Sequence, residues 1–290
     1  GINSGYLILV SPRDDIIKLI HTLIHETIHK QFSEGWRRIN PKDFWLFRIL
    51  NEALTEELTC ELLTEISNKN PRLRNQRVKK LVKGRFLDAI FKEIGVYLVY
   101  ISERRFLRAL LKRLDSKLKS LGIERLDIRA EDVVFGCLEE GDLTLLSNLL
   151  GKRCWEKILE ITNIIKDGEL REDYYLLYKL GLNLMAEAIK HPEAEEKLDV
   201  LKILLEILYD MLGKSIPEEI EMAFKAAQRL FKEILTTTQA TSFNKKELKR
   251  KLQAYYKKNS EIGNDESSLN SNPPTTPQDA SSRGLNRIVI

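Results

Sequence analysis

The sequence has few histidines, few cysteines and no long apolar run. Its 290 residues include 4 His, 3 Cys, 8 Pro and 14 Gly. These proline and glycine counts exclude collagen-like and low-complexity chains, and 43% hydrophobic residues exclude a chain that stays unfolded. The longest apolar run, Val96–Ile101, is far shorter than the roughly 18–20 residues that cross a bilayer. We therefore expect a globular protein without a membrane-spanning segment.

The cysteines are odd in number and widely separated, at Cys60, Cys137 and Cys154, and they form no Cys-x-x-Cys pair. A disulfide framework or a cysteine-based zinc site needs paired cysteines at short spacings. These residues are therefore expected to be free thiols that fill small spaces in the core. Such usage is typical of a reducing compartment, and we expect a cytoplasmic protein.

Strand signals are confined to the amino terminus. Tyr6–Val10 follows a turn-forming Asn-Ser-Gly, and its aromatic and β-branched residues indicate a strand. Residues 11–14, Ser-Pro-Arg-Asp, then give a helix start with Ser as the N-cap and Pro in the first helical position. This helix is predicted to run to about Phe32, because apolar residues recur at helical spacing.

The rest of the chain indicates helices only. After a polar loop at 33–40, Asn40 and Pro41 repeat the start signal and predict a helix to about Ser67. Gly and Pro then separate expected helices at 75–92, 94–119, 130–139, 142–150, 153–166, 170–190, 193–213, 217–237 and 244–258. Residues 259–290 are rich in Ser, Asn, Thr and Pro, and we expect a disordered tail there. The predicted fold class is mainly α.

Three of the four histidines fall within nine residues, and two of them form the pattern His-Glu-x-x-His. Residues four apart lie on one face of a helix, so His25 and His29 can bind one zinc ion, with Glu26 as the general base. The alternative is a pair of surface histidines on an amphipathic helix. We interpret His21 as a core or supporting residue, because three stacked residues on a straight helix cannot all surround one tetrahedral ion.

A catalytic zinc site needs a third protein ligand. The next predicted helix contains Asn51, Glu52 and Glu56, and the two glutamates share a face. One of them can bind the metal, while the other accepts a hydrogen bond from a ligand imidazole and fixes its tautomer. The alternative is a glutamate-rich helix that only faces solvent.

The pattern His25-Glu-x-x-His29, followed by Asn51-Glu52-Ala-Leu-Thr-Glu56, resembles the gluzincin zinc metallopeptidases, the thermolysin-like group. The resemblance covers roughly residues 1–67. It implies a zinc-dependent peptidase with Tyr6–Val10 as the edge strand that pairs with an extended peptide. The roles it implies are zinc ligand for His25, His29 and Glu52, general base for Glu26, and support of a ligand histidine for Glu56, with Asn51 beside it.

A second similarity concerns the Tyr-x-x-Gly pattern of aminopeptidase-like gluzincins, whose tyrosine stabilises the oxyanion. Tyr178 and Gly181 match it, which implies a catalytic role for Tyr178. Tyr174 and Tyr175 are rivals for this role, and an ordinary aromatic helix face is the alternative.

The chain also departs from the family. The Gly-x-Met-x-Asn substrate motif is absent from residues 1–24, and one strand is visible where the family has several. Either an amino-terminal sheet precedes this sequence, or the chain is a minimal version. A compact zinc peptidase of the repressor-cleaving kind also fits, because Leu62 and Leu63 match a Leu-Leu pair in its third-ligand helix.

The charge is unevenly distributed. Residues 70–122 hold 15 Lys and Arg against 4 Asp and Glu, and residues 244–258 hold 7 against 1. The favoured interpretation is solvated faces and pairing with acidic helices. A nucleic-acid or anionic-membrane surface at 72–85 and 245–258 is the second interpretation, because aromatic residues are interleaved with the basic residues of 70–122.

These patterns predict three parts: a gluzincin-like core at 1–70, an all-helical domain at 71–258 and the tail at 259–290. The predicted function is hydrolysis of a peptide or protein substrate by a zinc-activated water. The alternative is a non-catalytic helical regulatory or nucleic-acid-binding protein with a structural or vestigial zinc site. The intact Glu26 argues against it, because a structural site has no use for a general base. A third hypothesis is that the helical domain binds a protein that is also the substrate.

Overall fold

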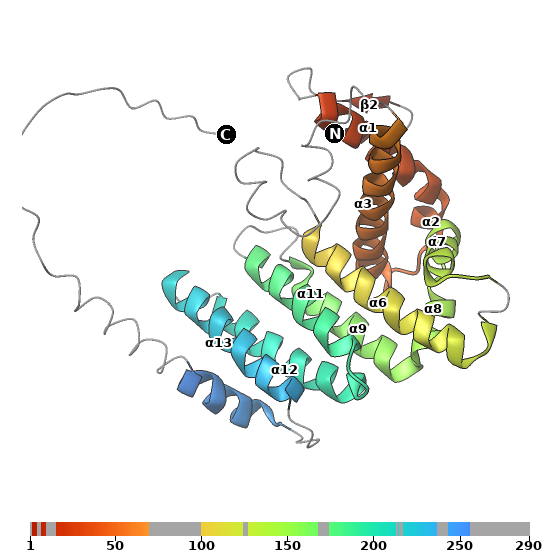
Figure 1. Cartoon of the computed structure of the whole chain (residues 1–290). Helices are drawn as coiled ribbons and strands as arrows, with labels where there is room; N and C mark the ends of the chain where they lie inside the picture. The colour runs from red at the N-terminus through yellow and green to blue at the C-terminus, as the bar shows by residue number, and fades with distance from the viewer. Residues whose placement is uncertain are drawn as a thin grey trace, which may run out of the picture.

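A computed structural model describes residues 2–4, 7–9, 16–69, 100–123, 127–167, 174–212, 214, 217–236 and 243–255. The described part is mainly α, as the sequence predicts (Figure 1). Several expectations lie outside the described residues: the helix start at 11–14, the helix at 75–92, the basic run at 72–85 and the disordered tail at 259–290.

Two strands of three residues each form a hairpin at the amino terminus. β1, Ile2–Ser4, pairs antiparallel with β2, Leu7–Leu9, so that Ile2 lies opposite Leu9. β2 falls inside the predicted strand Tyr6–Val10. The described residues contain no other strand, and the role of this segment as an edge for an extended peptide remains a prediction.

The helix that carries the His-Glu-x-x-His pattern is α1, Ile16–His29. It continues into a 3-10 turn, η1 (Lys30–Phe32), and then into α2, Ser33–Arg38. The prediction of a loop at 33–40 is therefore wrong over most of its length.

Tertiary contacts explain why α2 is helical. The indole of Trp36 packs edge-on against the rings of Phe44 and Phe47, with centroids 5.5 and 5.0 Å away. On the same helix, the backbone of Gly35 lies against that of Gly141, and a Cβ built on Gly35 would be 1.9 Å from the Leu138 carbonyl oxygen. These partners are distant in sequence, so the local pattern of polar residues could not reveal them.

The long helix α3, Phe44–Lys69, runs antiparallel to α1 and begins three residues after Pro41. The side-chain oxygen of Asn40 accepts a hydrogen bond from the Lys42 amide at 3.1 Å, within the turn that precedes the helix. The first half of α3 is buried around most of its circumference. Four polar residues therefore lie inside the protein rather than on a solvated face: Asn51, Thr55, Glu56 and Thr59.

From position 130 onward the remaining helices agree with the predicted ranges to within a few residues, and before them α6 ends within one residue of its predicted end. They are α6 (Ile101–Ser120), α7 (Ala130–Glu140), α8 (Thr144–Leu150), α9 (Lys152–Ile165), α11 (Tyr175–Ile189), α12 (Ala194–Leu212), α13 (Pro217–Thr236) and a last helix at 245–255. None of the described helices is both long enough and apolar enough to span a bilayer.

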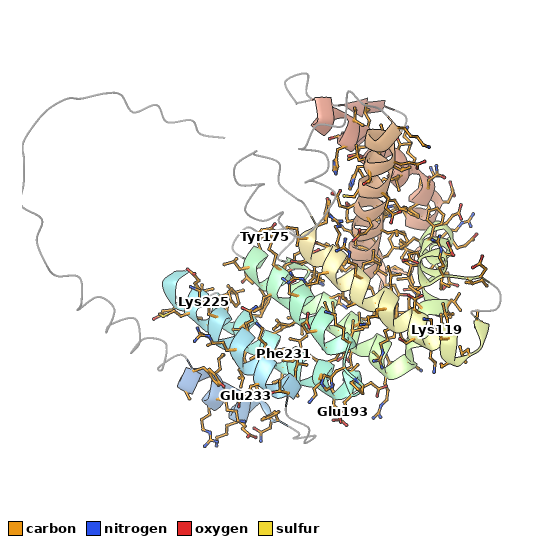
Figure 2. The ribbon with its side chains drawn as sticks, viewed as in Figure 1. Lys119, Tyr175, Glu193, Lys225, Phe231 and Glu233 are labelled. Carbon is orange, nitrogen blue, oxygen red and sulfur yellow. The ribbon has the colours of Figure 1, made fainter. Side chains whose placement is uncertain are left out.

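The helices pack as an array that α3 crosses. α6, α11, α12 and α13 contact one another in this order, and α3 contacts α1 on one side and α6 on the other (Figure 1). The buried side chains form one cluster that extends from Ile28 to Leu252. Figure 2 shows Phe231 on α13, which is fully buried in this cluster, and Lys119 at the far end of α6. The histidine helix and the later helices therefore share a core, and the division at residue 70 remains a prediction.

Candidate metal centre

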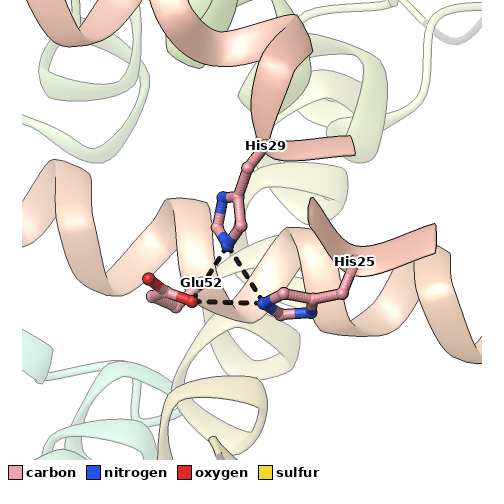
Figure 3. Close-up of side chains that lie close together, drawn as sticks. All are labelled: His25, His29 and Glu52. Atoms are coloured by element: carbon pink, nitrogen blue, oxygen red, sulfur yellow. Dashed lines mark hydrogen bonds and ion pairs between the residues drawn. The ribbon is translucent and has the colours of Figure 1, made fainter. Parts of the chain in front are cut away.

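Two histidines of α1 and one glutamate of α3 converge where these helices meet (Figure 3). The Nε2 atom of His29 lies 3.0 Å from Nε2 of His25 and 3.2 Å from Oε2 of Glu52. The distance between His25 Nε2 and Glu52 Oε2 is 3.5 Å. Within the described part of the chain, these three residues form the one group with the spacing of metal ligands.

The far side of each imidazole faces an acceptor. Nδ1 of His29 lies 2.6 Å from Oδ1 of Asn51, and Nδ1 of His25 lies 3.1 Å from Oε2 of Glu56. The Asn51 acceptor favours the tautomer of His29 with the proton on Nδ1, which leaves a lone pair on Nε2. Oε2 of Glu56 lies within ion-pair distance of Nδ1 of His25, but these two atoms do not have hydrogen-bond geometry. The Nε2 atoms of His25 and His29 and a carboxylate oxygen of Glu52 lie close to one another.

This donor set fits a zinc ion. With bonds of about 2.0–2.1 Å in tetrahedral geometry, two ligand atoms lie about 3.3–3.4 Å apart, and the three observed separations span 3.0 to 3.5 Å. Three electron-pair donors at this distance repel one another unless a cation or a proton lies between them. Two histidines and a carboxylate also leave the fourth position of a tetrahedral ion open, as catalytic zinc sites require.

The electrostatics of the group match the geometry. Burial alone would raise the pKa values of Glu52 and Glu56, but hydrogen bonds to the histidines outweigh it and lower both to about 2. Burial likewise opposes protonation of His25, but hydrogen bonds and charge from the same two carboxylates raise its pKa to about 9. The site therefore attracts positive charge, whether from a proton or from a cation.

A layer of buried polar groups lies behind the three converging residues. Glu56 is 2% exposed, and its second oxygen lies 3.1 Å from Nε2 of His21. Asn51 is fully buried, and the Thr55 hydroxyl lies 3.4 Å from both Asn51 Oδ1 and His29 Nδ1. Asn51 and Glu56, the two residues expected to support the ligands, thus each contact a different histidine.

Glu26 follows His25 on α1, and its side chain is partly exposed. It makes no hydrogen bond or ion pair with another described residue, so nothing in that part of the chain engages its carboxylate. The role of general base remains a prediction.

The structure puts Tyr178 inside the core. Tyr178 on α11 is 3% exposed and hydrogen bonds to the carboxyl group of Glu103. The ring of its rival Tyr174 packs against Tyr209, with centroids 5.2 Å apart. Tyr175 lies at the exposed start of α11, with the Lys179 ammonium 4.2 Å above its ring (Figure 2). The catalytic role of Tyr178 remains a prediction.

Tyr100 is an aromatic residue that contacts the centre, and it was not among the residues expected there. Its ring stacks on the imidazole of His25, with centroids 5.9 Å apart and planes 6° from parallel. Its backbone is left-handed, with φ 78° and ψ 22°, immediately before α6. Such a conformation is costly for a residue with a Cβ, at about 1–2 kcal/mol. The expected helix at 94–119 placed Tyr100 in a helix interior, and no local signal marks the break.

The charged surface was interpreted in two ways, and the described part bears on one of them. In the helix at 245–255, the Lys245 ammonium pairs with Asp210 at 3.3 Å and Glu206 at 3.9 Å, both on α12. On α3, Glu57 pairs with Arg104 and Arg108 of α6. These ion pairs are of the kind that the favoured interpretation predicts, in which basic helices pair with acidic ones.

Comparisons of the chain with protein-family models, with curated proteins and with solved structures find no match. The gluzincin resemblance therefore rests on the quoted residues and remains a prediction.

Proposed function

We propose that the protein is a zinc-dependent peptidase whose metal ligands are His25, His29 and Glu52. The observation that carries the proposal is the convergence of two imidazole Nε2 atoms and one carboxylate oxygen at 3.0 to 3.5 Å. Each histidine is held from behind by a different buried acceptor, which is the usual arrangement around a zinc ion. A surface pair of histidines on an amphipathic helix would need none of these contacts.

When bound, zinc supplies a Lewis acid that polarises a carbonyl group and lowers the pKa of a coordinated water to about 7. The chain supplies the remaining groups. Glu26 accepts the proton of the attacking water and returns it to the leaving amine. Asn51 and Glu56 keep the ligand imidazoles in the tautomer that presents Nε2 to the centre. The substrate class that this machinery suits is a peptide or a protein.

A cytoplasmic location is part of the proposal. Cys60, Cys137 and Cys154 are all free and buried, so each is a thiol in the core rather than half of a disulfide. Thiols of this kind are usual in reducing compartments.

Zinc stoichiometry tests the metal site. Purified protein dialysed against zinc and then against buffer should hold one zinc per chain, and Glu52→Ala and His29→Ala should hold much less. His191→Gln, which changes a histidine outside the centre, is the matched control and should hold one zinc. A wild-type protein without zinc contradicts the proposal.

Peptide hydrolysis tests the chemistry separately from metal binding. Glu26→Gln removes the proton acceptor but leaves the three ligands, so it should retain zinc and lose hydrolysis of a mixed peptide library. Undiminished hydrolysis by Glu26→Gln contradicts the role of Glu26. A wild-type protein that binds zinc but cleaves no peptide favours the non-catalytic regulatory alternative.

A further inference from the structure

The side chain of His21 contacts the metal centre through Glu56. His21 lies one turn before His25 on α1, and their rings stack with centroids 5.9 Å apart. Glu56 bridges the two imidazoles with different oxygens: Oε1 lies 3.1 Å from Nε2 of His21, and Oε2 lies 3.1 Å from Nδ1 of His25. We propose that His21 is a positioning residue of the zinc site, a role that rests on the proposed metal centre.

Because Glu56 engages its Nε2 atom, His21 does not act as a metal ligand. Its role is to hold the Glu56 carboxylate in position. Its Nε2 faces Glu56 and is not among the atoms that converge between His25, His29 and Glu52. The carboxylate of Glu56 is almost fully buried, at 3% side-chain exposure, and a buried carboxylate needs hydrogen-bond donors on both oxygens. The other described donor near Oε1 is the Cys60 thiol at 3.8 Å, which is a weak one.

Removing the donor at Oε1 therefore affects Oε2. A glutamate side chain turns about three single bonds, and a carboxylate that loses one partner rotates to find another. Rotation of Glu56 moves Oε2 away from Nδ1 of His25, so this imidazole loses both its orientation and its preferred tautomer. Substitutions of such outer partners cost about 10–100-fold in metal affinity or activity.

His21 also differs from the other supporting residues in its exposure. Its side chain is 35% exposed, whereas that of Glu56 is 3% exposed. Replacing His21 therefore leaves a gap at the surface rather than a cavity in the core, and the fold should tolerate the change. This separates an effect on the metal site from an effect on folding.

The test compares two replacements of similar size. His21→Gln keeps an N–H donor that can reach Glu56, whereas His21→Leu has none. Zinc affinity is measured by competition with a chromophoric chelator, and the visible absorption of the cobalt-loaded protein reports the ligand geometry. His191→Gln is the control histidine, and the melting temperature of each metal-free variant reports folding.

We expect His21→Leu to bind zinc about 10–100-fold more weakly than wild type, with an altered cobalt spectrum and little change in melting temperature. His21→Gln should recover most of the affinity and the wild-type spectrum. Wild-type affinity in His21→Leu overturns the proposal, and so does an equal loss in both variants. Failure of the wild-type protein itself to bind zinc is a different result, because it removes the metal centre on which the role depends.

Discussion

The Nε2 atoms of His25 and His29 lie 3.0 Å apart while both Nδ1 atoms face acceptors. Two unprotonated nitrogens do not approach so closely without positive charge between them. In the metal-free protein a proton on His25 supplies that charge, and its pKa is raised to about 9. The zinc ion that we propose would therefore compete with this proton for the same position.

The competition predicts how stability depends on pH. Because the pKa of His25 is higher in the folded than in the unfolded chain, protonation of His25 stabilises the metal-free fold. This contribution is complete at pH values below the unfolded-state pKa near 6.5, and it is lost as the pH rises through 9. The lowered pKa values of Glu52 and Glu56 stabilise the fold above their unfolded values near 4.5, and this contribution is lost as the pH falls towards 2. Metal-free protein should therefore be most stable between pH 5 and 6.5, and should lose roughly 3 kcal/mol between pH 6.5 and 9.

Urea titrations of the metal-free protein at pH 5.5, 7 and 9 measure this loss. The same titrations with excess zinc should show a stabilisation that grows with pH, because zinc binds the deprotonated imidazole. His25→Leu should remove the pH-dependent loss. A metal-free stability that does not change between pH 6.5 and 9 contradicts the prediction.

Glu52 is predicted to be the ligand whose charge cannot be replaced. Glu52→Gln keeps the size and one acceptor oxygen but removes the negative charge, and neutral amides are poor zinc ligands. Zinc content should fall well below one per chain, and the pKa of His25 should fall, because one of the carboxylates that raise it is lost. The matched control is Glu61→Gln, an exposed glutamate on the same helix, which should bind zinc as wild type does. Equal zinc binding by the two variants would show that Glu52 is not a ligand.

Substitutions of Asn51 test whether the orientation of a ligand imidazole affects zinc binding when all three ligands are kept. It is fully buried, and its Oδ1 lies 2.6 Å from Nδ1 of His29. Asn51→Leu leaves a buried N–H of His29 without its acceptor, which should cost about 1–3 kcal/mol of stability and about 10–100-fold in zinc affinity. Asn51→Asp retains an acceptor and should bind zinc more nearly as wild type does. Chelator competition and urea denaturation measure the two effects, and unchanged zinc affinity in Asn51→Leu counts against the role.

Most helix positions, and the closeness of His25, His29 and Glu52, could be predicted because their signals are local. His25 and His29 are four residues apart on one helix, and Glu52 stands in a recognisable pattern on the next. Gly and Pro mark the helix ends after residue 130. The motif residues could therefore be identified without knowing which surfaces the helices bury.

The missed features depend on partners that are distant in sequence. Helix α2 depends on the contact between Gly35 and Gly141, and the task inferred for His21 depends on Glu56, 35 residues away. The aromatic pattern around Tyr178 is compatible either with a catalytic site or with a helix face in the hydrophobic core. Packing of α11 against α6 puts Tyr178 in the core. Tyr100 lies in a continuous apolar run of the sequence, and its stacking on His25 depends on a residue 75 positions away. A short-range pattern contains none of this information.

The contact between α2 and α7 gives a stability prediction with an internal control. Gly35→Ala introduces a Cβ that would lie 1.9 Å from a backbone oxygen, so α2 must move and stability should fall by about 2 kcal/mol or more. Gly136 lies within α7 with nothing within 4 Å of an added Cβ, and Gly136→Ala should stabilise the protein by about 0.5–1 kcal/mol. Thermal unfolding of both variants measures the difference. A Gly35→Ala variant as stable as wild type contradicts the close approach.

Tyr100 gives the last prediction, because its backbone and its ring have separable effects. Tyr100→Gly relieves the left-handed conformation, a gain of about 1 kcal/mol, but removes the ring that stacks on His25. Its net stability should change little while its zinc affinity falls several-fold, because one face of the His25 imidazole loses its packing. Tyr100→Phe keeps the stacked ring and should bind zinc as wild type does. The control is Asp127→Gly, the other described non-glycine residue with a positive φ, at 56°, which should be slightly stabilised with unchanged zinc affinity. Equal zinc affinity in Tyr100→Gly and wild type would show that the stacking does not hold His25 in place.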